Sequence, residues 1–188
     1  MNFKKISGII LLLTLFAAGV TAGYLYFSGV VSQGDKVPEK LAKAPQPEDL
    51  VSLSLYYPVA GQLQMEGRKA PRGTGATAVA EATVREYLKG PAIKTSGVQY
   101  LPAEAQLLGA YRGTDGVIYL DLSDEFRRNF QGDALAEFLL LKGLFQSLIA
   151  NVHDLRDVKV LIEGKEVETL GGHLFLSYPL QDIILYER

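Results

Sequence analysis

Apolar residues dominate the first part of the chain. The run from Ile6 to Val31 contains no charged residue, and a helix that crosses the hydrocarbon core of a bilayer needs about 20 apolar residues. Lys4 and Lys5 precede the run, and basic residues mark the cytoplasmic side of a spanning helix. The pattern predicts one transmembrane helix over residues 6–31 that anchors the chain in the cytoplasmic membrane, with the N-terminus inside and the remainder on the extracytoplasmic side.

A cleaved secretory signal is the alternative interpretation of residues 1–31. Val20, Thr21 and Ala22 resemble the small residues that precede a cleavage site, and the domain would then be secreted after cleavage near Ala22. The apolar run continues after Ala22 as GYLYFSGVV, which favours an uncleaved anchor.

Residues 32–49, SQGDKVPEKLAKAPQPED, are polar and contain three prolines. This composition is typical of an extended linker, and we interpret the stretch as a tether. Residues 50–188 are enough for one domain with its own hydrophobic core. The chain is therefore expected to consist of an anchor, a tether and one domain.

The pattern within residues 50–188 predicts a mixed α+β domain. Period-two alternation indicates strands over 51–58, 105–113, 117–123 and 157–164. Helical spacing indicates one helix that Thr77 caps and Gly90–Pro91 ends, and a longer one that begins at Asp133. The order β-α-β-β-α-β predicts a two-layer sandwich in which two helices cover one face of a single sheet. Residues 59–75, rich in glycine and charge, are expected to form a hairpin or a loop outside this core.

The segment GKEVETLGGHLFLSYPL, residues 164–180, follows the last core strand and contains His173, one of two histidines. It predicts an appended C-terminal hairpin with turns at Gly164–Lys165 and Gly171–Gly172. Ser177 lies four residues after His173, about 13 Å along a strand, so the two side chains are not expected to meet. We interpret Gly171, Gly172 and His173 as a structural turn and expect no catalytic residue here.

Several kinds of site are excluded by the composition. The chain has no cysteine, which excludes disulfides, thiolate metal sites and a thiol nucleophile. Its two histidines lack the short spacing of a metal site, and His153 is expected to cap the end of the long helix. GTGATA, residues 73–78, matches a dinucleotide-binding pattern but does not directly follow a strand. We expect no cofactor, no metal and no enzymatic activity.

The charge balance limits the partners. The net charge is −2, and without Lys4 and Lys5 the 19 basic residues become 17 against 21 acidic ones. An acidic extracytoplasmic part argues against nucleic acid.

The long helix is expected to place one apolar stripe against the sheet. Leu140 and Leu144 fall on the opposite side, one turn apart. A stacked pair of exposed leucines is typical of a partner contact, and we take them as the candidate contact. Packing against residues 59–75 or the tail DIILYER is the alternative.

Several stretches together resemble the GerMN domain family of sporulation and spore-germination proteins. They are LSLYYP, QLQMEGRKAPR with a Glu-x-Arg segment, YLKGP, YLPAEAQLLGAYRGTDGVIYLDLSDEF, and the region from SLIANVHDL to LSYPL. The resemblance covers residues 50 to about 180. It implies a fold similar to the ring-building motif of envelope secretion machines and a non-enzymatic role in envelope assembly or wall remodelling. The family's founding protein has two such domains and a lipid-modified cysteine, whereas this chain shows one domain and no cysteine.

Two functions remain open. The first is a membrane-anchored protein-interaction module that associates with itself or with other envelope proteins. The second is a peptidoglycan-binding module, or an accessory to wall hydrolysis, that grips neutral glycan through Tyr56, Tyr57, Tyr111 and Tyr119.

Overall fold

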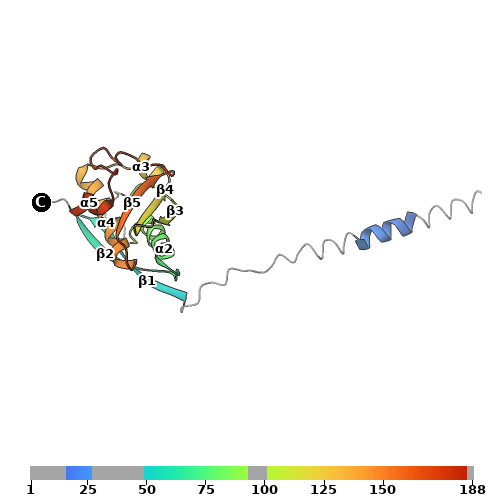
Figure 1. The fold of residues 1–188 in the computed structure, drawn as a ribbon. Coiled ribbons are helices and arrows are strands. Elements are labelled where there is room, and N and C mark those ends of the chain that lie inside the picture. The colour runs from blue at the N-terminus through green and yellow to red at the C-terminus, as the bar shows by residue number, and fades with distance from the viewer. Residues whose placement is uncertain (1–15, 27–48, 93–100, 186–188) are drawn as a thin grey trace, which may run out of the picture. The chain divides into compact units, whose positions relative to one another are not determined.

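The computed structural model describes residues 16–26, 49–92 and 101–185. It divides into two compact units, Met1–Ala44 and Pro45–Arg188. We call the second unit the domain, and Figure 1 labels its strands and helices.

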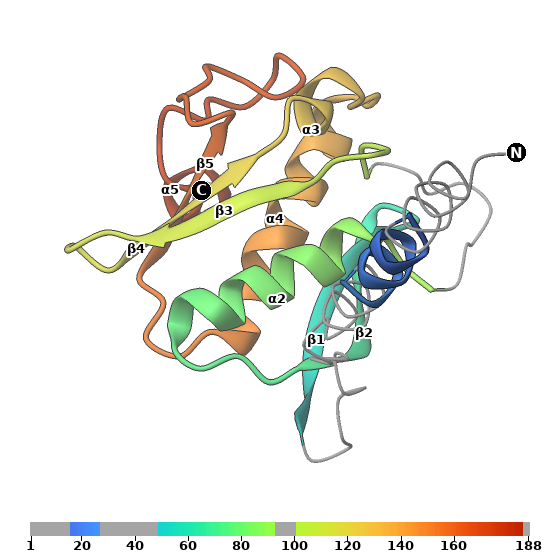
Figure 2. The same ribbon diagram turned by 90° about the vertical axis from the view of Figure 1, so that its right-hand side faces the viewer.

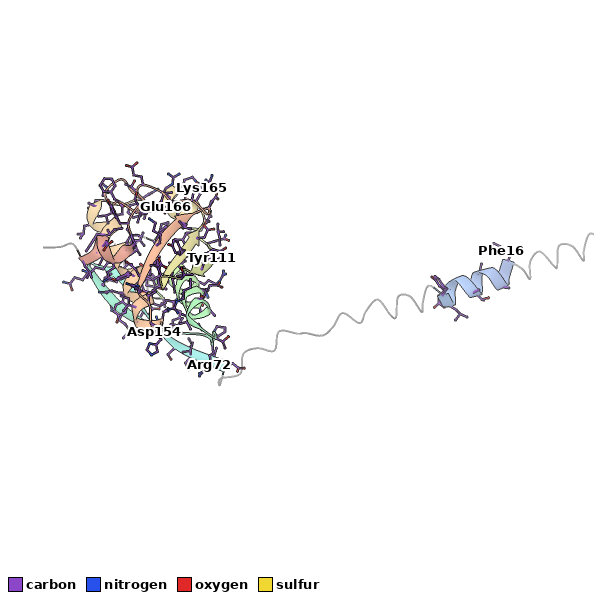
Figure 3. The ribbon with its side chains drawn as sticks, in the orientation of Figure 1. Phe16, Arg72, Tyr111, Asp154, Lys165 and Glu166 are labelled. Carbon is purple, nitrogen blue, oxygen red and sulfur yellow. The ribbon has the colours of Figure 1, made fainter. Side chains whose placement is uncertain are left out.

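In the first unit, residues 16–26 form an apolar helix with exposed side chains, and Phe16 on it is labelled in Figure 3. The other residues of the predicted span 6–31, and residues 32–48 of the predicted tether, lie outside the described part of the chain. Within the described part, α4 (Ala134–Asn151) is the one helix long and apolar enough to cross a membrane, and 56 % of it is buried inside the domain. Such burial is typical of the core helix of a globular domain.

The domain begins with a hairpin of β1 (Leu50–Val59) and β2 (Gln62–Pro71), paired antiparallel along their whole length. Both turn residues, Ala60 and Gly61, have positive φ, as tight hairpin turns require. These two strands form a separate sheet, so the prediction that the first strand belongs to a single sheet is wrong. Most side chains of β2 face solvent. Glycine and charged residues are therefore tolerated there, and the sequence lacks the apolar alternation that would indicate a strand.

The edge of β1 that β2 leaves free is occupied by side chains of α4. The Tyr56 N–H donates to Ser147 Oγ at 2.9 Å, and Ser54 exchanges two hydrogen bonds with the Asn151 side chain, at 2.9 and 2.8 Å. Gly143 allows this approach, because a Cβ there would lie 2.4 Å from the Tyr56 carbonyl oxygen. Helix α4 therefore takes the place that a third strand would have at this edge.

The second sheet has the strand order β3-β4-β5. β3 pairs antiparallel with β4, and β5 pairs parallel with β4. Helix α2 begins after Gly75 without a side-chain cap, so the capping role predicted for Thr77 is wrong. The bounds are α2 Ala76–Leu88, β3 Leu107–Arg112, β4 Val117–Leu122, α3 Glu125–Arg128 and β5 Asp157–Ile162.

Helix α4 begins as predicted, with the Asp133 carboxylate accepting from the Ala136 N–H at 2.9 Å. It then runs between the two sheets, beside α2 (Figure 2). Leu140 and Leu144 are fully buried in the core cluster that both sheets share. The prediction that they form an exposed partner patch is wrong, because the β1–β2 hairpin and α2 cover the side of α4 that one sheet would have left open.

Candidate functional site

The segment after β5 is an irregular loop, residues 163–179, rather than the predicted hairpin of two strands. Its first turn has positive φ at Glu163 and Gly164, and an isolated bridge then joins Thr169 to Phe175. Gly171, Gly172 and His173 lie at the tip of the excursion that this bridge closes, with φ of +95° at Gly172. In Figure 3, Lys165 and Glu166 of this loop lie at the end of the domain opposite Asp154.

A buried carboxylate holds the tip of the 163–179 loop. Glu137, in the first turn of α4, is fully buried. Its Oε1 accepts from the backbone N–H groups of Leu170 and Gly171 at 3.1 and 3.0 Å, and its Oε2 accepts from that of His173 at 3.1 Å. A carboxylate removed from water needs such partners. The side chain of Glu137 therefore has a structural role, and His173 contributes its backbone to it.

Close packing restricts this contact further. A Cβ on Gly171 would lie 2.5 Å from Cε1 of Phe130 and 3.0 Å from Oε2 of Glu137. Glycine is required here because the loop backbone lies directly against the ring and the carboxylate.

Two residues of β5 hold the other end of the loop. Lys159 is nearly buried, with 7 % of its side chain exposed; it donates to the Ser177 carbonyl oxygen and lies 3.6 Å from the Glu166 carboxylate. Asp157 Oδ1 accepts from the backbone N–H of Gln181 at 3.0 Å. Charged side chains therefore hold the loop at its tip, through Glu137 of α4, and near its C-terminal end, through Lys159 of β5.

The fixed loop and helix α5 (Leu180–Leu185) line a pocket of about 500 Å³. Phe175 and Tyr178 line it and remain 59 % and 61 % exposed. A pocket of this size, mostly apolar with a few polar groups, is typical of a ligand site. The lining residues are His173, Leu174, Phe175, Tyr178, Asp182 and Ile183.

The polar groups of the pocket are free to meet a ligand. Neither the Asp182 carboxylate nor the His173 imidazole forms a side-chain hydrogen bond or ion pair with another residue in the described ranges. No group of three metal-ligating side chains occurs in the described residues, and no hydrogen-bonded Ser–His–acid chain occurs there either. In the part of the chain that the structure describes, no lining group of this pocket is placed to activate a nucleophile.

The remaining sequence candidates have other positions. Tyr57 is buried in the core, whereas Tyr111 is exposed on β3, so the tyrosines proposed to grip glycan do not form one exposed platform. His153 is exposed, and its Nδ1 accepts from the Asp154 N–H at 3.1 Å. Its predicted role as a cap of the α4 carbonyl groups is wrong.

Comparison with protein families gives one match that decides the family. The model described as "Germane: Sporulation and spore germination" matches residues 54–168, more than half of the chain. The chain belongs to the Germane family. The family description concerns sporulation and germination and names no reaction.

Solved structures similar to this Germane domain have low sequence identity. A candidate lipoprotein from Clostridium perfringens is 22 % identical with a TM-score of 0.51, over 72 % of this chain and 90 % of its own. The tandem GerMN domains of the sporulation protein GerM from Bacillus subtilis are 23 % identical with a TM-score of 0.48, over 65 % of this chain and 43 % of theirs. The first GerMN domain of GerM alone is 20 % identical with a TM-score of 0.47, over 65 % of this chain and 90 % of its own. The lipoprotein shows a shared fold, and a comparison with curated protein sequences gives no significant match.

The Glu-x-Arg segment of the Germane domain has a structural role. Arg68 pairs with Glu66, lies 3.9 Å from Glu86, and donates to the Gly90 carbonyl oxygen at 2.9 Å. Burial alone would lower the pKa of the Arg68 guanidinium, but the hydrogen bond to Glu66 raises it, so Arg68 is always charged. The segment therefore fixes the end of α2 at its glycine–proline stop.

Sequence reasoning missed the residues that build the pocket of the Germane domain. Glu137 was not singled out, because an acid in the first turn is expected from the helix dipole alone. One signal could have identified it, since it is the sole charged residue between Asp133 and Lys142 in an otherwise apolar helix. Phe175, Tyr178 and Asp182 lie in segments without periodicity, and nothing in their spacing indicates a shared pocket.

Proposed function

We propose that this chain is a membrane-tethered, non-enzymatic interaction module on the extracytoplasmic side of a bacterial cell envelope. The apolar run over residues 6–31, preceded by Lys4 and Lys5, supports the attachment and its orientation. The family description supports a role connected with sporulation or germination. The partners we propose are a second copy of the chain or other envelope proteins.

The observation that carries this proposal is the pocket on the 163–179 loop. Its aromatic walls are exposed, while the backbone behind them is held by the buried Glu137 and the nearly buried Lys159. A rigid apolar pocket with an open aromatic rim supplies the contact area that drives protein association.

Peptidoglycan binding is the second candidate function. Phe175 and Tyr178 favour it, because exposed aromatic rings can also stack on the apolar faces of sugars. These two rings are the candidate glycan contacts in this second function, instead of the tyrosines named from the sequence, because Tyr57 is buried.

The absence of cysteine from the chain allows a direct test. Tyr178→Cys in the full-length protein, carrying a photoactivatable benzophenone on the introduced thiol, reports what lies at the pocket in living cells. Asp154→Cys is the matched control, since Asp154 is strongly exposed and does not line the pocket. We expect protein adducts specific to the Tyr178 position. Adducts with wall fragments would favour the second function, and identical adducts at both positions would refute a role for the pocket.

A further inference from the structure

The pocket of the 163–179 loop combines one carboxylate with two exposed aromatic rings. Asp182 contributes the carboxylate, and Phe175 and Tyr178 contribute the rings. No basic side chain of the described residues pairs with Asp182. Asp182 is exposed, and an unpaired carboxylate at a pocket rim can accept a charge-assisted hydrogen bond from a cationic group.

Aromatic faces add to this preference. The negative face of a phenyl or phenol ring attracts ammonium and guanidinium groups. The domain already contains two such pairs, with Lys142 Nζ 4.9 Å from the ring centre of Phe138 and Arg68 Cζ 6.0 Å from that of Tyr57. The pocket offers the same ring types together with a countercharge and has no cation of its own among the lining residues.

The apolar part of the pocket fits the remainder of a basic side chain. Leu174 and Ile183 are half-buried and line the pocket, and the methylene stem of a lysine or arginine packs well on such surface. The acidic balance outside the membrane segment, 17 basic against 21 acidic residues once Lys4 and Lys5 are removed from the 19, favours a basic segment over an acidic one.

We propose that the pocket binds a lysine or arginine side chain of a partner protein, with the stem against Leu174 and Ile183 and the charged group between Asp182 and the rings of Phe175 and Tyr178. This inference rests on the proposed function, because it names the chemistry of the partner at the same pocket. Charge complementarity selects a basic peptide over a neutral glycan, which would gain nothing from the charge on Asp182.

The two histidines give an internal reporter for the test. His173 lines the pocket, whereas His153 lies outside its lining beside Asp154. The full chain, labelled on histidine and held in nonionic detergent micelles, should show separate imidazole signals for the two residues, and the variant His153→Asn would assign them. The probe is the peptide acetyl-Ala-Leu-Lys-Ala-amide. Its controls are the same peptide with ε-acetyl-lysine, the same peptide with glutamate, and a chitin trimer.

We expect the lysine peptide to shift the His173 signal saturably and to leave the His153 signal unchanged. The acetyl-lysine and glutamate peptides should bind at least about tenfold more weakly, since they lose the charge-assisted contact. Asp182→Asn should weaken binding of the lysine peptide by about the same factor. The Asp182 carboxylate holds no other residue of the described domain, so the fold and the His153 signal should be kept. Tyr178→Ala should weaken binding, and Tyr178→Phe should retain it.

Three outcomes overturn the proposal. Equal affinity for lysine and acetyl-lysine peptides, unchanged in Asp182→Asn, would show an apolar site without charge selection. A response to the chitin trimer alone would assign the pocket to glycan. No response to any probe would exclude this chemistry, while specific protein adducts from Tyr178→Cys in cells would still support the interaction module itself.

Discussion

The contact between Glu137 and the tip of the 163–179 loop gives the sharpest prediction about stability. Glu137→Ala removes the acceptor of three backbone N–H groups, those of Leu170, Gly171 and His173. A hydrogen bond to a charged group contributes about 1.5–3 kcal/mol, and the cost of burying the carboxylate offsets part of the sum. We expect the free energy of unfolding to fall by about 3–5 kcal/mol.

Glu137→Gln separates charge from geometry. Oε1 carries two of the three contacts and Oε2 carries the third. A glutamine can place its carbonyl oxygen at the Oε1 position, but its amide group then faces the His173 N–H, donor against donor. The loss should be about 2 kcal/mol, clearly smaller than that of the alanine variant.

Urea unfolding of the full chain in nonionic detergent, followed by far-ultraviolet circular dichroism and tyrosine fluorescence, measures both losses. Glu81→Ala is the control, because Glu81 forms an exposed pair with Arg85 at 3.7 Å and such pairs contribute little. A loss below about 1 kcal/mol for Glu137→Ala would refute the structural role of this carboxylate. Equal losses for alanine and glutamine would refute the assignment of two contacts to one oxygen.

Three further predictions test the packing. Gly171→Ala should lower the free energy of unfolding by about 2 kcal/mol, measured in the same assay, because its Cβ would lie 2.5 Å from the ring of Phe130. Leu144→Ala should lower the free energy of unfolding by about 2–5 kcal/mol, because it truncates a buried core side chain. A loss below about 0.5 kcal/mol would indicate that Leu144 is exposed after all. Burial raises the pKa of Tyr57 and of Tyr87, which stack at 5.1 Å. Because each phenol stays neutral longer in the folded than in the unfolded chain, its contribution to the free energy of unfolding is complete below about pH 10. Above that pH it is lost by about 1.4 kcal/mol per pH unit for each tyrosine. Tyr57→Phe should halve this slope in urea unfolding between about pH 10 and 11.5, and an unchanged slope would contradict it.

The elements that the sequence predicts well are those whose pattern depends on local geometry. The β3–β4 hairpin lies where alternation and the turn Thr114–Gly116 place it, and α4 begins at the predicted cap Asp133. Residues 59–75 were expected to form a hairpin or a loop, but the pairing of β2 with β1 could not be predicted, since most side chains of β2 face solvent.

The predicted exposure of Leu144 was wrong for a related reason. Helical periodicity assumes one buried side, whereas α4 has elements packed around most of its circumference. The pocket loop could not be predicted at all, because side-chain contacts to its backbone, such as those of Glu137 and Lys159, leave no periodic signal.

The polar residues of α4 explain why a helix with the hydropathy of a membrane span belongs to the domain core. Glu137 binds the backbone of the 163–179 loop, while Ser147 and Asn151 bind the backbone of β1. In a bilayer the Glu137 carboxylate would face hydrocarbon without these partners, at a cost of several kcal/mol, whereas Ser147 and Asn151 also bond carbonyl groups of their own helix. In the domain each of them satisfies backbone groups that no strand reaches. Glu137, Ser147 and Asn151 therefore join the pocket loop and the hairpin to the core helix in one structure.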